Sequence, residues 1–263
     1  MSALADAAAG PFATYPSLRG QVVVVSGGAT GLGAEFVAQF AGQGARVAFV
    51  DIQDEAGRAL AEAVGAGGSP KPLYRHADVR DIAAYQQVIV EMAQELGPVG
   101  VLINNAANDT RHKPDQVGTA FWDERMRVNL DHYYFATRTV VPMMRAAGKG
   151  SVVNLGSIST HIKLRDLVVY RTAKAGVEGL TRALAQELGP DGIRVNCIIP
   201  GWVMTPRQLA YAVDAEAEAT IDREQALSRR VMPDDIARMA LWLAADDSQA
   251  CTGQNWIVDG GWM

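Results

Sequence analysis

Hydrophobic residues of this chain fall into short continuous runs, separated by stretches in which apolar residues recur at helical spacing. The runs predict seven strands, at 22–25, 46–50, 72–77, 99–103, 151–155, 193–199 and 255–258. Apolar positions three and four apart predict helices between them, at 34–43, 54–64, 82–96, 121–147, 167–188 and 233–245. The helix at 121–147 is expected to bend near Pro142.

Strands that are apolar throughout are typical of a sheet covered on both faces. Their alternation with helices predicts an α/β fold of the Rossmann type, with a single doubly wound parallel sheet of about seven strands flanked by helices. Residues 17–263 are expected to form one domain, after a flexible extension at 1–16. The polar stretch 204–230 is either a mobile lid over a substrate or an ordinary surface excursion.

Composition narrows the possible partners. The chain has 263 residues, of which 49% are hydrophobic, and a net charge of -5. An acidic surface repels phosphate backbones and anionic lipids, which argues against nucleic-acid and membrane partners. No apolar run reaches the ~20 residues of a membrane helix, and residues 1–16 lack the basic residues of a secretory signal. A cytoplasmic protein is expected. Cys197 and Cys251 are predicted to be buried thiols, although a disulfide between them stays open.

A glycine-rich segment, Ser-Gly-Gly-Ala-Thr-Gly-Leu-Gly at 26–33, joins the first strand to the first helix. Glycines there let the backbone turn tightly and approach a pyrophosphate, and a helix N-terminus offers it free N–H groups. The segment therefore predicts a dinucleotide site, with cofactor contacts at Gly27, Thr30, Gly31, Leu32 and Gly33.

An acidic residue at the end of the second strand bears on which dinucleotide is bound. Asp51 lies 18 residues past Gly33, and Ile52 rather than an arginine follows it. A carboxylate there can hydrogen-bond the ribose hydroxyls of NAD and would repel the 2′-phosphate of NADP. We therefore expect NAD, with Ile52 also near the cofactor. The alternative is that Asp51 is only a helix cap or turn residue.

Two further strand ends are candidate cofactor contacts. Asp78 and Val79 follow the third strand and are predicted to reach the adenine, although an Asp there is as often a plain cap. In the segment 104–107, Asn105 and Ala106 are predicted to lie beside the cofactor. The alternative is that the amides of this segment mainly tie strand ends together.

Tyr170 and Lys174 stand four residues apart in a predicted helix, which puts both on one face. A free Tyr has a pKa near 10, and an ammonium within ~4–6 Å favours the phenolate and lowers that pKa. Ser157 follows the fifth strand, and the carboxyl ends of parallel strands line one crevice. These three residues are therefore predicted to form a catalytic group, with Tyr170 as the base. Tyr170 and Lys174 are also predicted to contact the cofactor, the lysine by a hydrogen bond to the nicotinamide ribose.

The sequence resembles the short-chain dehydrogenase/reductase family from about Leu18 to the C-terminus. The resemblance rests on the glycine segment and on Asn-Asn-Ala-Ala at 104–107, Val-Asn-Leu at 128–130, Gly-Ser at 156–157, Tyr-x-x-x-Lys at 170–174, Pro-Gly at 200–201 and Asp-Gly-Gly at 259–261. Two positions depart from the family pattern, which usually has Thr where Ser26 stands and Gly where Ala107 stands.

The resemblance implies residue roles that the spacing alone does not. Asn129 would join the other three as a catalytic tetrad and hold a water that links the lysine to solvent. The remaining cofactor contacts that it implies are Pro200, Gly201, Val203 through its backbone, and Thr205. It also implies a homotetramer and a mechanism in which Tyr170 removes the hydroxyl proton while carbon transfers hydride to the nicotinamide.

Other segments resemble the bacterial NAD-dependent aldose 1-dehydrogenases of this family, such as the enzymes for D-xylose or L-arabinose. They include 15–18, 108–113, 122–125, 157–161 and Arg207-Gln208. The resemblance implies oxidation of an anomeric hydroxyl to an aldonolactone. Polar and aromatic groups near the strand ends suit such a polyhydroxylated substrate, and the candidates are Asn108, Asp109, Ser157, Ser159, His161, Trp202 and Gln208. The alternative is local hydrogen bonding within the loops, and 111–113 can equally be an exposed basic turn.

Other functions stay open. The substrate can instead be another secondary alcohol, such as a sugar acid, a deoxy-keto acid or a hydroxysteroid. An NAD-binding regulator without catalysis is a different class, and the intact Ser157, Tyr170 and Lys174 argue against it. His76 and His132 have no metal-ligand spacing with each other or with the cysteines, so no metal is expected.

Overall fold

The computed structural model describes residues 12–263, so most of the expected extension at 1–16 lies outside the described residues. The predicted α/β architecture is confirmed. The sheet has seven parallel strands: β1 (Val22–Ser26), β2 (Arg46–Asp51), β3 (Leu73–His76), β4 (Val99–Asn104), β5 (Gly150–Leu155), β6 (Ile193–Pro200) and β7 (Asn255–Val258).

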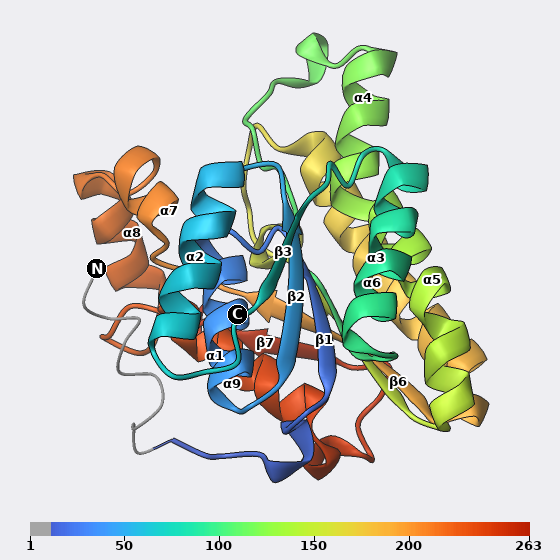
Figure 1. Ribbon diagram of the computed structural model, residues 1–263. Helices are drawn as coiled ribbons and strands as arrows, with labels where there is room; N and C mark the ends of the chain where they lie inside the picture. Colours follow the sequence, from blue (N-terminus) through green and yellow to red (C-terminus); the bar gives the residue numbers. More distant parts are fainter. Residues whose placement is uncertain (1–11) are drawn as a thin grey trace.

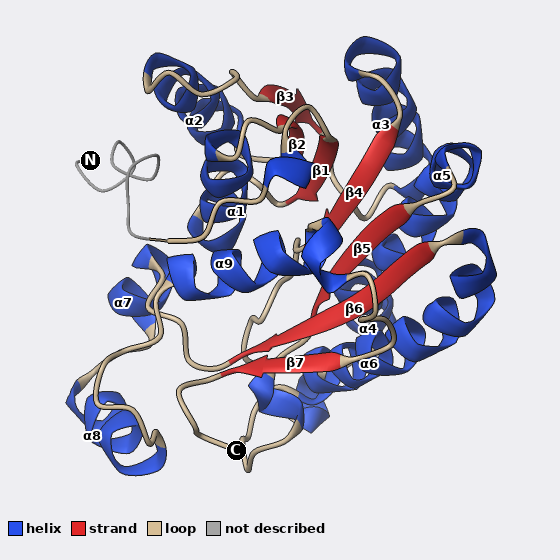
Figure 2. Ribbon diagram, turned by 90° about the horizontal axis from the view of Figure 1, so that it is seen from below, coloured by secondary structure: helices blue, strands red, loops and turns tan. Residues whose placement is uncertain are grey.

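Helices cover both faces of this sheet, as Figure 2 shows. One layer holds α1 (Gly31–Gly42), α2 (Asp54–Ala66) and α9 (Pro233–Ala244). The other holds α3 (Ile82–Leu96), α4 (Thr119–Met126), α5 (His132–Ala147) and α6 (Val168–Leu188). Each layer seals its own apolar core against the sheet, with Phe36 and Phe40 in the first and Ile89 and Met144 in the second. No helix within residues 12–263 is both long and apolar enough to cross a membrane.

The strand order is β3-β2-β1-β4-β5-β6-β7. The direction of winding therefore reverses between β1 and β4, which pair in parallel. In such sheets ligands bind outside the carboxyl ends of the strands, next to this reversal. Ser26 and Asn104 end these two strands, and the side chain of Asn104 donates to Asn154 Oδ1 of β5 at 2.9 Å. An amide of the segment 104–107 thus ties strand ends together, as one interpretation predicted.

The helix expected at 121–147 is interrupted, but not at Pro142. A π-helical turn at Arg127–Asp131 separates α4 from α5, and Pro142 lies inside α5. Within the turn, the Asn129 side-chain amide donates to the Arg125 carbonyl at 2.9 Å. The side chain thereby supplies a hydrogen-bond partner to a carbonyl near the irregular turn. The spacing of apolar residues could not reveal this bond.

The stretch 204–230 contains two short helices, α7 (Pro206–Tyr211) and α8 (Ala215–Glu224). Both stand apart from the three layers in Figures 1 and 2. The side chains of Thr205 and Asp214 cap them, by accepting from the N–H groups of Gln208 at 3.2 Å and Ala217 at 2.9 Å. The segment is thus ordered locally while it packs outside the main layers.

Candidate active site

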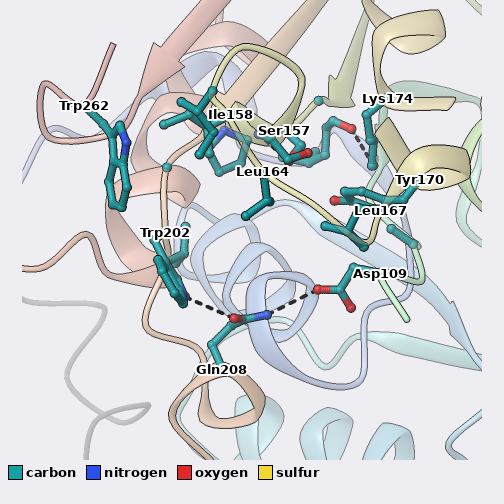
Figure 3. Close-up of a pocket in the computed structure, with 18 of the residues that line it drawn as sticks. Asp109, Ser157, Ile158, Leu164, Leu167, Tyr170, Lys174, Trp202, Gln208 and Trp262 are labelled. Atoms are coloured by element: carbon teal, nitrogen blue, oxygen red, sulfur yellow. Dashed lines mark hydrogen bonds between the residues drawn. The ribbon is translucent and has the colours of Figure 1, made fainter. Parts of the chain in front are cut away.

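A cavity of about 750 Å³ lies at the carboxyl ends of β4, β5 and β6. Figure 3 shows Ser157, Tyr170 and Lys174 on one side of it, and Trp202 with Trp262 on the other. Many of the residues expected at the site line this cavity: Leu32, Asn105, Asp109, Ser157, Ser159, Tyr170, Lys174, Pro200, Gly201, Trp202, Val203, Thr205 and Gln208.

The three groups of the expected catalytic constellation come together here. Tyr170 and Lys174 lie one turn apart on α6, with the Lys174 nitrogen 5.7 Å from the centre of the Tyr170 ring. Ser157 follows β5, and its hydroxyl donates to Ser159 Oγ at 2.8 Å. All of them face the same cavity, so a substrate hydroxyl can meet a phenol and a serine hydroxyl at once.

Burial dominates the ionisation of this group. It raises the pKa of Tyr170 to about 12, although hydrogen bonding with Ser157 opposes the rise. Burial lowers the pKa of Lys174 to about 8. We expected the ammonium to lower the pKa of the phenol; instead the loss of solvation outweighs every opposing contribution in this cavity.

Lys174 is held by partners that the sequence did not indicate. Its ammonium donates to the Tyr133 hydroxyl at 2.8 Å and to the Leu155 carbonyl at 2.7 Å. Tyr133, on α5, is fully buried and also donates to the Leu155 carbonyl, at 3.2 Å. These bonds fix the position of the amine at the edge of the cavity that Lys174 lines. The position of Tyr133 in the sequence, four residues past Asn129, does not indicate its contact with Lys174.

Asn129 lies outside the cavity lining, fully buried in the π-helical turn. Its side-chain oxygen accepts the Asn108 N–H at 2.8 Å, and its amide donates to the Asn108 carbonyl at 3.1 Å. The side chain therefore anchors the loop after β4 to the helix below it. Within the described residues, these hydrogen bonds give Asn129 a structural role.

The glycine segment makes a narrow backbone cradle. Gly27 and Gly31 have positive φ angles of 65° and 57°, which favour glycine. A Cβ on Gly33 would lie 1.8 Å from the Gly27 carbonyl oxygen. Asn105 closes the cradle from β4, because its amide donates to the carbonyls of Ser26 and Gly27, both at 3.0 Å. These features fit a dinucleotide pyrophosphate against the N-terminus of α1, where Thr30 is the N-cap residue.

Asp51 supports this cradle from β2. One carboxylate oxygen accepts the Ala29 N–H at 3.0 Å, and the other accepts the Gln53 N–H at 3.0 Å. The turn role that was left open is therefore present. Ile52 beside it is 58% exposed. The oxygen that bonds the Gln53 N–H also accepts the Gln53 side-chain amide, at 3.3 Å. The oxygen that bonds the Ala29 N–H can accept a further hydrogen bond, so the turn role leaves room for a ribose hydroxyl.

Nine expected cofactor contacts lie outside the cavity lining: Gly27, Thr30, Gly31, Gly33, Asp51, Ile52, Asp78, Val79 and Ala106. The last three have partners elsewhere in the protein. The Asp78 carboxylate pairs with the Arg80 guanidinium at 2.6 Å, which holds the pKa of Asp78 below its usual value. Val79 is buried in the second core. The Ala106 carbonyl oxygen is 3.0 Å from His132 Nε2, and the Ala106 N–H donates to Ser26 Oγ at 3.1 Å.

Three of the expected substrate groups form a connected wall. The Trp202 indole donates to Gln208 Oε1 at 3.1 Å, and the Gln208 amide donates to Asp109 Oδ2 at 3.4 Å. Figure 3 marks both bonds. Arg207 pairs with the other oxygen of Asp109 at 2.5 Å. This wall offers donors and acceptors to a polar ligand.

Two other expected substrate groups are engaged within the protein. The Asn108 side chain accepts from the Thr110 N–H at 3.0 Å and from the Thr110 hydroxyl at 2.7 Å. His161 Nε2 lies 2.8 Å from the buried Glu178 carboxylate. Neither side chain lines the cavity, so both make the local hydrogen bonds that were the alternative to substrate binding.

Sequence reasoning also missed part of the cavity wall. Trp262, one residue from the C-terminus, lines the cavity with its ring 6.2 Å from that of Trp202. Asp259 turns the chain toward this position by accepting the N–H groups of Gly261 at 2.8 Å and Met263 at 2.9 Å. The sequence feature that could have indicated this part of the wall is the tryptophan in the C-terminal Gly-Gly-Trp-Met. Ile162, Leu164 and Leu167 add an apolar side that no motif indicated.

Two other expectations concern cysteines and metals. Cys197 is buried and Cys251 is partly buried, and both are free thiols. Within residues 12–263, no three His, Cys, Asp or Glu side chains gather as a potential metal site.

Comparison with known proteins gives consistent matches. Residues 27–263 match a family model described as enoyl-(acyl carrier protein) reductase, a short-chain dehydrogenase/reductase family. The chain is 50% identical to a D-xylose 1-dehydrogenase of Caulobacter vibrioides over 250 residues, which cover 95% of this chain and 98% of that protein. It is 44% identical to the probable galactose dehydrogenase of Rhizobium meliloti, with the same coverage.

A solved structure agrees with the fold. A 7α-hydroxysteroid dehydrogenase in complex with NADH superimposes with a TM-score of 0.88 at 27% identity, covering 94% of this chain and 96% of the other. The family-model match, the relatives and the crevice described above agree. The chain therefore belongs to the short-chain dehydrogenase/reductase family, whose members are oxidoreductases that act on CH–OH groups with a nicotinamide cofactor.

Proposed function

We propose that this protein oxidises the anomeric C1 hydroxyl of an aldose, a pentose such as D-xylose or L-arabinose, with NAD, and releases an aldonolactone. The observation that carries the proposal is one cavity in which Ser157, Tyr170 and Lys174 face Asp109 and Gln208. The first three groups suit the oxidation of an alcohol, and the other two suit recognition of neighbouring hydroxyls. The similarity to the D-xylose enzyme supports the same substrate class.

The chain's own residues supply positioning and proton transfer. The C1 hydroxyl lies between Tyr170 and Ser157, and the phenolate form of Tyr170 takes its proton as the C1–H bond breaks. Ser157 donates a hydrogen bond to the substrate oxygen as its charge develops. A nicotinamide held beside Pro200, Gly201 and Val203 would supply the acceptor for the hydride that leaves C1. Because C1 of a cyclic aldose also carries the ring oxygen, the new carbonyl makes the product a lactone.

Asp51 supports NAD over NADP. Its carboxylate ends β2 beside the glycine cradle and is 8% exposed. A 2′-phosphate at that position would bring a second negative charge against a poorly solvated one, whereas ribose hydroxyls can donate to it. We also propose that the protein is cytoplasmic and that it forms a homotetramer. Light scattering of the purified protein would test the tetramer.

The test is an initial-rate screen that follows NADH or NADPH formation. Pentoses, hexoses, deoxysugars, sugar acids and a hydroxysteroid are each offered with NAD and with NADP. We expect a pentose with NAD to give the highest kcat/KM, and NMR to detect the lactone. Oxidation of only a non-sugar alcohol, or a preference for NADP, would contradict the proposal.

A further inference from the structure

His112 lies next to the cavity-lining Arg111, yet its ring is buried, with 6% exposure. Both ring nitrogens are engaged. Nδ1 is 2.9 Å from the Thr110 carbonyl oxygen, and the Val169 N–H donates to Nε2 at 3.1 Å. Because the Val169 amide can only donate, Nε2 must be unprotonated and Nδ1 must carry the hydrogen. The interactions thus require one neutral tautomer. The exposed basic turn considered for 111–113 does not apply to His112.

The bond to Val169 caps a helix from a distant segment. Helix α6 begins at Val168, and Leu167 before it provides no side-chain cap. The first N–H groups of a helix lack partners within the helix. His112, 57 residues away in the sequence, supplies one of them. The capped amide immediately precedes Tyr170, so the bond acts on the turn that carries the phenol.

The chain leading into this turn is constrained. Asp166 has a φ of 63°, and within residues 12–263 it is the only residue other than glycine with a positive φ. Its carbonyl accepts the His112 N–H at 2.9 Å, and His112 forms a short parallel bridge with Leu167. A left-handed residue of this type persists where its surroundings hold it. The loop around His112 provides that support.

The same loop is anchored at its other end. Asn129 binds the Asn108 backbone through two hydrogen bonds, and the Asn108 side chain binds Thr110. Thr110 in turn accepts from His112. A continuous series of hydrogen bonds therefore connects the π-helical turn to the first turn of α6. The ring of His112 also packs edge-on against Phe121 of α4, at 4.9 Å.

We propose that His112 is a positioning residue, whose neutral ring caps Val169 and thereby sets the place of the Tyr170 hydroxyl against Ser157 and the substrate. The role in turnover rests on the proposed function; the cap itself does not. Because His112 does not line the cavity, its loss should lower kcat while NAD binding stays intact. A misplacement of ~1 Å can lower a rate by up to about 10²-fold.

Two substitutions separate capping from packing. His112→Leu fills space but accepts no hydrogen bond, and we expect kcat to fall about 10- to 100-fold with an unchanged dissociation constant for NAD. His112→Gln keeps an acceptor and a donor, and should restore most of kcat. Asp81→Ala is the matched control, because it removes the cap of α3, where Asp81 Oδ1 accepts the Ala84 N–H at 3.1 Å. It should retain wild-type kcat.

Equal kcat in His112→Leu and wild type, no rescue by His112→Gln, or an equal loss in Asp81→Ala would each overturn the proposal. A measurement on the wild-type protein covers the case in which a variant does not fold. The ¹⁵N chemical shifts of His112 should show the neutral tautomer with hydrogen on Nδ1. A ring protonated on Nε2 would refute the cap. If the wild-type protein oxidises no aldose, the proposed function fails, while this spectrum still decides the cap.

Discussion

The pKa values of individual cavity side chains are shifted mainly by desolvation. Tyr170 and Lys174 move in opposite directions, since burial disfavours the phenolate of the first and the ammonium of the second. A base of this kind depends on hydrogen bonds to its charged form. In the free protein Ser157 provides one such stabilising interaction for the phenolate. The chemistry therefore depends on a few atoms of Ser157 and Tyr170.

Removal of the Tyr170 hydroxyl tests this dependence. Tyr170→Phe keeps the ring but cannot accept the substrate proton, so turnover should fall by at least ~10²-fold, the usual scale for general acid–base catalysis. NAD binding, measured by calorimetry, should change little. Tyr134→Phe on α5, where the tyrosine is 44% exposed, is the control. Wild-type turnover in Tyr170→Phe would refute the assignment of the base.

At the scale of elements, α7 is joined to the loop after β4 across nearly a hundred residues of sequence. Arg207 and Gln208 both bind the Asp109 carboxylate, and Gln208 also accepts from Trp202. Helix α7 is otherwise outside the three main layers (Figure 2). We propose that the segment 204–230 is a lid over the cavity and that the Arg207–Asp109 ion pair holds it closed.

Arg207→Met should loosen this lid. The Arg207 side chain is 60% exposed, and exposed pairs contribute about 0.2–1 kcal/mol. We therefore expect KM for the sugar to rise by up to about fivefold, and limited proteolysis within 204–230 to become faster. Arg58→Met, which removes an ion pair on the remote helix α2, is the matched control. Unchanged proteolysis and KM would show that the pair does not hold a lid.

At the scale of the whole molecule, one buried amine affects stability. Lys174 is 1% exposed, and its pKa falls from 10.5 to about 8 on burial. Between these values the unfolded chain binds more protons at this residue than the folded protein does. The contribution of Lys174 to the free energy of unfolding therefore rises with pH through this window, and it is unfavourable below pH 8.

Lys174→Met should remove this penalty and the activity together. The lowering of the pKa corresponds to about 3 kcal/mol, so the variant should gain up to that amount of stability at pH 7. The difference in the free energy of unfolding between the two proteins should shrink from pH 8 to 10. Urea titrations at several pH values measure it, and Lys149→Met, an exposed lysine, is the control. A pH-independent difference would contradict the buried-amine explanation.

The fold was predictable because its determinants are local in the sequence. The apolar runs of β1, β2 and β6 and the spacing in α3 follow from which faces must be buried. The positive φ angles at Gly27 and Gly31 likewise depend on the residue type itself. The π-helical turn at Arg127–Asp131 was missed, since a change of backbone hydrogen bonding leaves the apolar pattern nearly unaltered.

The sequence by itself thus determined the order of strands and helices, the glycine cradle and the presence of a Ser, Tyr and Lys group on one crevice. Only the tertiary structure decided what each polar side chain binds. It directs Asn108 and His161 to internal partners, buries His112 against α6, and brings Trp262 to the cavity. The physical reason is that Asn108 is anchored by Asn129, His161 by Glu178 and His112 by Val169, which lie 21, 17 and 57 residues away in the sequence. Their alignment depends on packing that no local pattern contains.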